Sequence, residues 1–106
     1  MTRRTRRMLA LDTEDDSEGA VQIINFFDGR HHQTFTRAQQ GEKFREAAWN
    51  WLYGQAPAHL WACNAEYDLV NLCGDWVGLM CTLQYVSSGL LRASFRDAAI
   101  TVFDTL

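Results

Sequence analysis

The feature that most constrains this chain is a short apolar run that ends in a cluster of acids. Met8 to Leu11 is uniformly apolar, which is typical of a β-strand covered on both faces. Residues 12–19 then carry five acidic side chains and finish at the turn residue Gly19. We therefore expect the strand to end at Asp12 and to present carboxylates at its C-terminal end.

A three-stranded antiparallel meander is predicted for the first third of the chain. A second strand follows over residues 21–27, and Asp28-Gly29 is a hairpin signal that returns the chain into a third strand over residues 31–35. The first strand would lie on the inner side of this meander.

The clearest helix follows that meander. Thr36 and Gln39 have the spacing of a capping box, and Gly54 and Pro57 end the helical pattern. Between them, apolar residues recur at helical spacing and predict one buried face, formed by Phe44, Ala47, Ala48, Trp51 and Leu52.

A second strand-helix pair comes next. Residues 60–63 form another apolar run, and Asn64 is a good N-cap for a helix that ends near Gly74. Its apolar side would carry Leu69, Leu72, Cys73 and Trp76.

The last quarter predicts a hairpin. Residues 80–85 fit the end of a helix and a strand equally, whereas 90–95 and 99–103 look like strands joined by the turn Arg96-Asp97. The predicted order is β-β-β-α-β-α-β-β, an α/β fold with a mixed sheet and flanking helices. Strands one and four would be parallel neighbours.

Composition sets wider limits. The 106 residues are 47% hydrophobic, as in an ordinary globular domain or part of one, and no stretch approaches the roughly 18 apolar residues that a membrane span needs. A net charge of -3 decides little, because bound metal ions supply positive charge locally at a carboxylate site. The basic segment 2–7 is expected to be a solvated lead-in, in preference to an arm that contacts phosphate.

The cysteines point weakly to a compartment. Cys63, Cys73 and Cys81 are odd in number, form no CxxC and have apolar neighbours, so we expect buried, reduced thiols and an intracellular location. That location is the cytoplasm, or a host cytoplasm for a viral or plasmid-borne protein.

Three carboxylates form the candidate site. Asp12 and Glu14 are two residues apart on a strand, which points them to one face, although such a pair alone is typical of a solvated turn. Asp68 would lie one turn into the second helix, at the edge of its apolar stripe, where an unpaired carboxylate is costly. If strands one and four are parallel neighbours, all three acids reach one crevice.

Divalent ions would resolve the repulsion among these acids. Oxygen-only ligands favour Mg²⁺ or Mn²⁺, and a pair of such ions is the arrangement used for in-line hydrolysis of phosphodiesters. The residues alone therefore predict a site for two metal ions at Asp12, Glu14 and Asp68.

Two segments resemble a known family. Residues 9–14, LALDTE, look like the first motif of the DEDD superfamily of 3′→5′ exonucleases, and residues 63–68, CNAEYD, resemble its second motif. Residues 100–106, ITVFDTL, are similar to a segment of the proofreading domain of family B DNA polymerases, especially the protein-primed group. The resemblance implies a ribonuclease H-like fold over residues 1–106, as the N-terminal part of such a domain.

The resemblance also implies roles for single residues. Asp12 would bridge both metal ions, Glu14 would bind the ion that activates water, and Asp68 would bind the second ion. The 3′ end of a single DNA strand would be positioned by Thr13, Asn64 and Tyr67. In the plain alternative these three are a turn hydroxyl, a helix cap and a packing ring.

The sequence departs from the family at its third motif, a Tyr or His followed within about five residues by Asp. Asp104 and Asp97 are the late candidates, and neither has Tyr or His four or five positions before it. The main hypothesis is thus a DNA-directed exonuclease domain whose third motif is missing here, which leaves turnover by this chain open. The rest of a polymerase chain, or a polymerase partner, would accompany it.

Two alternatives stay open. The chain could be a non-catalytic module that binds nucleic acid or a polymerase, or a DEDD exoribonuclease, since nothing in the sequence reads the 2′-hydroxyl.

His31 and His32 are interpreted as an exposed pair at a hairpin edge. Among the tryptophans, the interpretation is packing for Trp51, Trp61 and Trp76, with Trp49 undecided.

Overall fold

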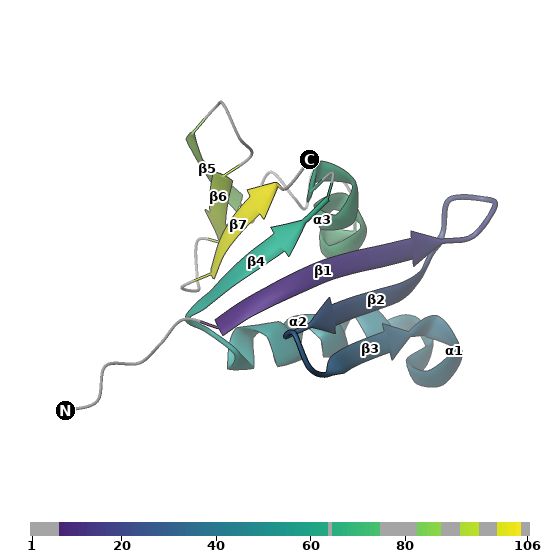
Figure 1. The fold of residues 1–106 in the computed structure, drawn as a ribbon. Coiled ribbons are helices and arrows are strands. Elements are labelled where there is room, and N and C mark those ends of the chain that lie inside the picture. Colours follow the sequence, from purple (N-terminus) through teal and green to yellow (C-terminus); the bar gives the residue numbers. More distant parts are fainter. Residues whose placement is uncertain (1–6, 64, 75–82, 88–91, 96–99, 105–106) are drawn as a thin grey trace.

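The computed structural model describes residues 7–63, 65–74, 83–87, 92–95 and 100–104. These residues form one mixed sheet with helices packed against it (Figure 1). The α/β class predicted from the sequence is therefore confirmed. None of the helices in these ranges is both long and apolar enough to cross a membrane.

Seven strands make up the sheet, in the order β3-β2-β1-β4-β7-β6-β5. The first strand, β1, pairs in parallel with β4, and β4 pairs in parallel with β7; the remaining neighbours are antiparallel. The expected parallel pairing of the first and fourth strands is thus confirmed. The strands are β1 (Arg7–Asp15), β2 (Val21–Phe27), β3 (His32–Thr36), β4 (Ala58–Ala62), β5 (Leu83–Ser87), β6 (Arg92–Phe95) and β7 (Ile100–Asp104).

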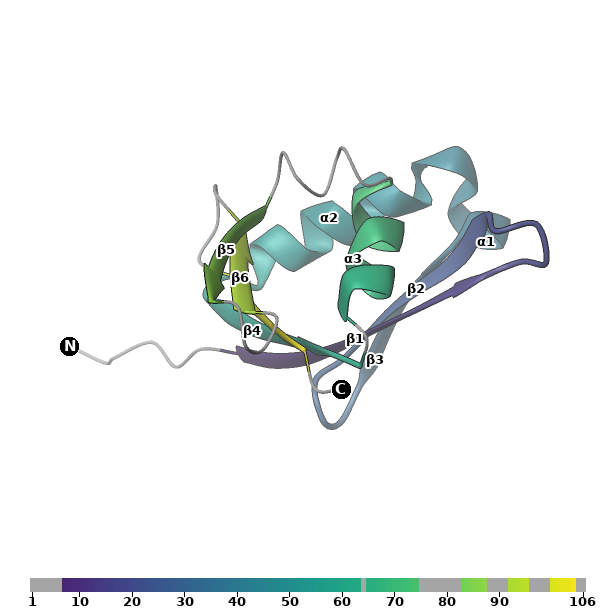
Figure 2. The same ribbon diagram turned by 90° about the horizontal axis from the view of Figure 1, so that it is seen from above.

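The helices lie on one face of the sheet, as the view from above shows (Figure 2). Helix α3 contacts β1, β4 and β7, while α2 contacts β3 and α3. The other face of β1, β2 and β4 carries no helix in the part of the chain that the structure describes. The helical segments are α1 (Arg37–Gln40), the 3₁₀ turn η1 (Gly41–Lys43), α2 (Phe44–Gly54) and α3 (Ala65–Cys73).

The predicted first helix is broken in the structure. Thr36 caps α1 as expected, because its Oγ1 accepts from the backbone N–H of Gln39 at 3.1 Å. The reciprocal bond comes from Gln40, not Gln39: the Gln40 Oε1 accepts from the Thr36 N–H at 2.8 Å. Gly41 then has a φ of 66°, which a right-handed helix cannot contain, so α1 ends there and α2 begins after η1.

The first strand is longer than predicted, and only one of its faces is covered. It continues through Asp12 to Asp15, because the backbone of this segment pairs with β2 while the acidic side chains alternate toward water. Leu9 and Leu11 are buried under the helices, but Met8 is 58% exposed on the open face. The expectation of a strand covered on both faces is therefore wrong.

The core lies between the helices and the sheet. It is built from the alternate residues of the central strands and the apolar stripes of α2 and α3. Trp51 packs against Phe26 at a centroid distance of 5.0 Å, as predicted. The largest fully buried side chains are Phe26, Phe44, Leu9, Ile24, Leu52, Leu60, Leu69, Leu72, Ile100 and Val102.

Two expectations fail next to the open face: Trp61 packs, as expected, but against Phe103 on that face instead of in the core, and Cys63 is not buried. Trp61 alternates with the buried Leu60 on β4, so the Trp61 ring lies on the open face and is only partly buried. Cys63 follows the end of β4 and is exposed, whereas Cys73 is partly buried. Trp76 and Cys81 lie outside the described residues.

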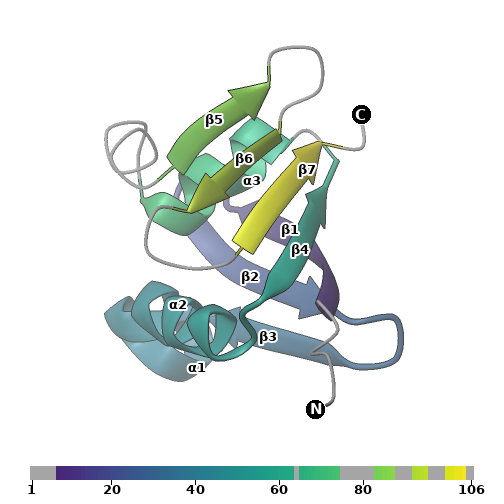
Figure 3. The ribbon, with the colours of Figure 1, turned by 90° about the vertical axis from the view of Figure 1, so that its left-hand side faces the viewer.

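The C-terminal strands differ from the prediction in number. The segment 80–85, which fitted helix and strand equally, overlaps β5 over residues 83–87, so the sheet has one strand more than predicted. The expected hairpin is present as β6 and β7, which pair in antiparallel fashion (Figure 3). Its predicted turn at Arg96-Asp97 lies outside the described residues.

Candidate metal centre

The alternation of β1 separates its polar residues onto two faces. Thr13 is buried against α3, while Asp12 and Glu14 are exposed on the open face. Their cross-strand neighbours on β2 are Asn25 for Asp12 and Ile23 for Glu14. Asp12 and Glu14 therefore share a face, as their spacing predicted, and they lie outside the hydrophobic core.

Asp68 is buried at the start of α3, with 3% of its surface exposed. Its Oδ1 accepts two bonds from Thr13: one from the side-chain Oγ1 at 2.6 Å and one from the backbone N–H at 3.2 Å. A buried carboxylate is tolerated only with such donors. Thr13 thus fixes the position of Asp68 from the neighbouring strand, a role that the sequence did not indicate.

Asn71 completes this buried polar group. It is 8% exposed, and its Nδ2 donates to the Thr13 Oγ1 at 2.9 Å. Positions 68 and 71 are three apart and lie on one side of the helix. Asn71 was not predicted as a site residue; the available signal was an amide three residues after Asp68, on the side of the helix that faces the sheet.

Asp12 and Asp68 line the same open pocket, of about 340 Å³. The pocket forms because β4 ends at Ala62 while β1 continues beside it to Asp15. The remaining lining residues are Ala10, Leu11, Trp61, Ala62 and Cys63. The structure thus brings together two of the three predicted ligands. Glu14 is not among the lining residues and lies two positions further along the same face of β1.

The electrostatics of the pocket centre on Asp68. Burial is the main cause that raises the pKa of this carboxyl, and the nearby carboxylates of Asp12 and Asp104 raise the pKa further. The two hydrogen bonds from Thr13 act in the opposite direction. Asp104 ends β7 opposite Ala62 of β4, so a third acid lies close to Asp68. The sequence predicts no ligand role for Asp104, because no Tyr or His stands four or five positions before it, as the third motif requires.

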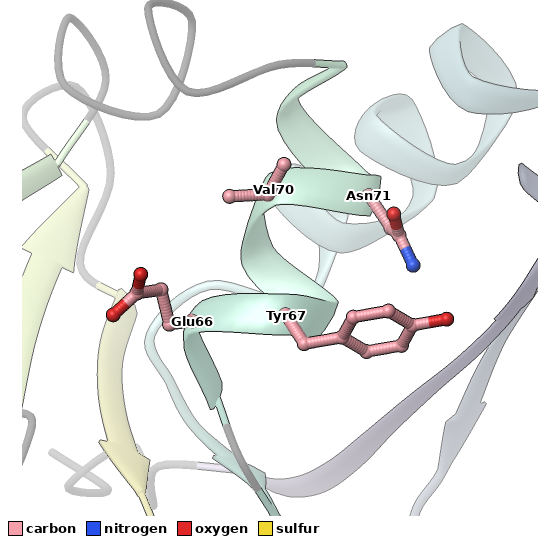
Figure 4. A pocket seen from close by; sticks show the side chains of 4 residues that line it. All are labelled: Glu66, Tyr67, Val70 and Asn71. Atoms are coloured by element: carbon pink, nitrogen blue, oxygen red, sulfur yellow. The ribbon is translucent and has the colours of Figure 1, made fainter. Parts of the chain in front are cut away.

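A second open pocket, of about 400 Å³, lies along α3 and is lined by Glu66, Tyr67, Val70 and Asn71 (Figure 4). Tyr67 and Asn71 extend to the same side of the helix in this view. The Tyr67 hydroxyl donates to the Asp15 Oδ1 at 2.5 Å, and this bond is the main cause that raises the pKa of Tyr67. Tyr67 is 41% exposed, so the packing alternative does not describe it.

The donor set fits a hard divalent cation. Carboxylate oxygens are the ligands that Mg²⁺ and Mn²⁺ prefer, and Asp12 and Asp68 provide them in one pocket. Within the described ranges, no group of three or more His, Cys, Asp or Glu side chains is arranged to hold a metal ion. Asn64, the third predicted DNA-binding residue, lies outside those ranges.

Comparisons with protein-family models, with curated proteins and with solved structures find no match for this chain.

Proposed function

We propose that this chain is a metal-dependent 3′→5′ exonuclease domain acting on single-stranded DNA, with a ribonuclease H-like fold. The observation that carries this proposal is the shared pocket of Asp12 and Asp68, which are far apart in sequence and come from a strand and a helix. Both belong to the segments that resemble the two exonuclease motifs.

The topology supports the proposal independently of the motifs. Asp12 lies on the central strand β1, and Asp68 lies on the helix that follows the adjacent parallel strand β4. Ligands of open α/β sheets bind at the carboxyl ends of such parallel strands. A mixed sheet with this arrangement is what the ribonuclease H-like resemblance implies.

Each residue has a separate task in this proposal. Asp12 and Asp68 hold the metal ions, with Glu14 as a further ligand from the same face of β1. Thr13 holds Asp68 in place through buried hydrogen bonds, and Asn71 holds the Thr13 hydroxyl, so that the Asp68 carboxylate is positioned before substrate arrives. Bound ions would polarise the phosphodiester and lower the pKa of a water molecule. Tyr67 and Asn64 position the 3′ end of the strand, as the resemblance implies. Thr13, for which the resemblance implied the same role, is buried with its hydroxyl bonded to Asp68 and Asn71.

The test is degradation of a 5′-labelled single-stranded DNA in the presence of Mn²⁺ or Mg²⁺. The expected result is a ladder that shortens from the 3′ end and disappears with a chelator, with Asp12→Asn and with Asp68→Asn. Glu18→Gln is the matched control, because Glu18 is an exposed acid in the turn after β1. The proposal would be refuted if the Asp12→Asn variant still shortened the DNA, or if the unchanged chain shortened it with neither Mn²⁺ nor Mg²⁺.

A second candidate, a non-catalytic nucleic-acid-binding or polymerase-binding module, is favoured by two observations. The shared pocket is lined by two carboxylates, and the sequence lacks the third-motif pattern before Asp97 and Asp104. Metal-dependent binding of the same DNA without any shortening would support this module over the nuclease. Running the degradation assay with RNA of the same sequence separates an exoribonuclease from a DNA enzyme.

A further inference from the structure

The open face of the sheet carries a row of rings that crosses five strands. The cross-strand register places His32, Phe27, Ala10, Trp61 and Phe103 side by side, from β3 through β2, β1 and β4 to β7. Every member of this row is aromatic except Ala10 in its centre. Because Ala10 is exposed, the row has a gap at that position.

The rings on each side of the gap stand upright from the sheet. Phe27 stacks on His32 with centroids 4.4 Å apart and planes 20° apart, and Trp61 stacks on Phe103 with centroids 4.4 Å apart and planes 17° apart. These separations are close to the spacing of neighbouring strands, about 4.8 Å. Two rings lying flat on the sheet would clash at a centroid distance of 4.4 Å. Each ring must therefore turn its face toward its neighbour in the row.

The gap is wide enough to admit one more ring. Phe27 and Trp61 are two strand spacings apart, about 9.5 Å, whereas a planar ring in contact on both faces needs about 7–8 Å. An open pocket of about 280 Å³ lies here, lined by Met8, Leu9, Ala10, Phe27, Asp28, Gly29 and Trp61. Phe103 stacks on one face of the Trp61 ring, and Trp61 lines this pocket together with Ala10 and Phe27.

Charge and position suggest what occupies the gap. The pocket above Ala10 shares Ala10 and Trp61 with the pocket that contains Asp12 and Asp68. At its other end, Arg30 lies in the turn between β2 and β3, and Arg7 lies near Asp28 of the same turn; both arginines are exposed. A chain of phosphates crossing this face would thus meet cations at one end and the candidate metal ligands at the other.

We propose that the gap over Ala10, between the rings of Phe27 and Trp61, is a stacking slot for one nucleobase of a single-stranded nucleic acid. Along β1, Ala10 and Asp12 are about 6.5–7 Å apart, so a base in the slot places an adjoining phosphate within reach of Asp12. Stacking between aromatic side chains accepts every base, since each has a π-face. The inference deepens the proposed function and rests on it for the class of ligand.

The test compares a fluorescent deoxyadenosine oligonucleotide with an abasic oligonucleotide of the same length, by anisotropy in the presence of a chelator. The 106-residue chain should bind the oligonucleotide with bases at least about fivefold more tightly. Ala10→Phe, which fills the slot with a ring of the protein, should abolish this preference. Ala38→Phe is the matched control, because Ala38 is an exposed alanine on α1, and it should leave the preference unchanged.

Phe27→Leu provides a second variant that opens the slot instead of filling it, and it should also lower the preference for bases. Circular dichroism confirms that each variant is folded. Equal binding of the two oligonucleotides, no binding of either, or a preference that survives Ala10→Phe would overturn the slot. A chain that shows no nuclease activity but keeps the preference for bases would count against the metal site and not against the slot, because the binding assay contains no divalent ion.

Discussion

Replacing Thr13 with Val tests whether the buried polar group holds Asp68 in place. Valine has nearly the shape of threonine but no hydroxyl, so the change removes the donor to the Asp68 Oδ1 and the acceptor of the Asn71 Nδ2. The backbone bond from residue 13 to Asp68 remains. The three side chains are 3–8% exposed, so water cannot easily replace the lost partners.

The magnitude follows from these two bonds. A hydrogen bond to a charged group contributes about 1.5–3 kcal/mol, and an ordinary one contributes about 0.5–1.5 kcal/mol. Thr13→Val should therefore lower the free energy of unfolding by about 2–4 kcal/mol, a large part of the roughly 5–15 kcal/mol of a typical domain. Thr13→Ser keeps the hydroxyl and loses one methyl group, which should cost about 1 kcal/mol.

Urea unfolding at neutral pH, followed by circular dichroism, measures both variants. The expected result is a lower midpoint for Thr13→Val with an unchanged dependence on urea concentration. If Thr13→Val proved no less stable than Thr13→Ser, the hydroxyl would not support Asp68 and the reasoning would fail. A double-mutant cycle with Asn71→Leu adds a check, because two residues in one network should show a coupling above about 0.5 kcal/mol.

Three further predictions concern Asp68, Asp28 and Gly41. Burial raises the pKa of the Asp68 carboxyl, so the charged carboxylate destabilises the folded, metal-free protein at neutral pH. Asp68→Asn should therefore raise the Tm of the metal-free protein at pH 7. This gain should vanish in acid, where the Asp68 carboxyl is protonated. A gain that persisted at low pH would contradict this explanation. The backbone N–H groups of His31 and Arg30 lower the pKa of Asp28, so its contribution to stability is present at neutral pH and lost as the pH falls through that lowered pKa. Asp28→Asn should accordingly lower the Tm at pH 7 and match the wild type at about pH 2, and equal Tm values at pH 7 would refute it. Gly41→Ala should destabilise the chain by about 1 kcal/mol or more in urea unfolding, because a residue with a side chain is strained at a φ of 66°; an unchanged midpoint would show that the turn relaxes.

Local patterns in the sequence predicted most elements of the fold. Period-two and period-3.6 patterns identify strands and helices because they reflect which side chains a single element buries. Turn residues such as Gly29, with a φ of 99°, mark hairpins because few other residues adopt that backbone conformation. Local patterns were ambiguous where a segment fitted a helix and a strand equally well, as in the segment 80–85, which overlaps β5.

Which face of a strand is covered depends on the rest of the chain. Met8 to Leu11 reads as buried throughout, yet the helices cover only the face of Leu9 and Leu11. The same ambiguity misplaced Trp61, whose apolar neighbours gave no sign that its ring would stack on Phe103 at the open face. Apolar residues predict burial, but the side on which they are buried depends on where helices pack.

The candidate site divides in the same way. The sequence by itself determined that Asp12 and Glu14 share a face of one strand and that Asp68 belongs to a helix, because those relations depend on backbone periods. Only the tertiary structure decided that Asp68 is held by Thr13 and Asn71, that Asp104 lies near it, and that Ala10 leaves a gap between two rings. Those contacts join residues that are distant in sequence, and they form only when β1, β4, β7 and α3 pack together.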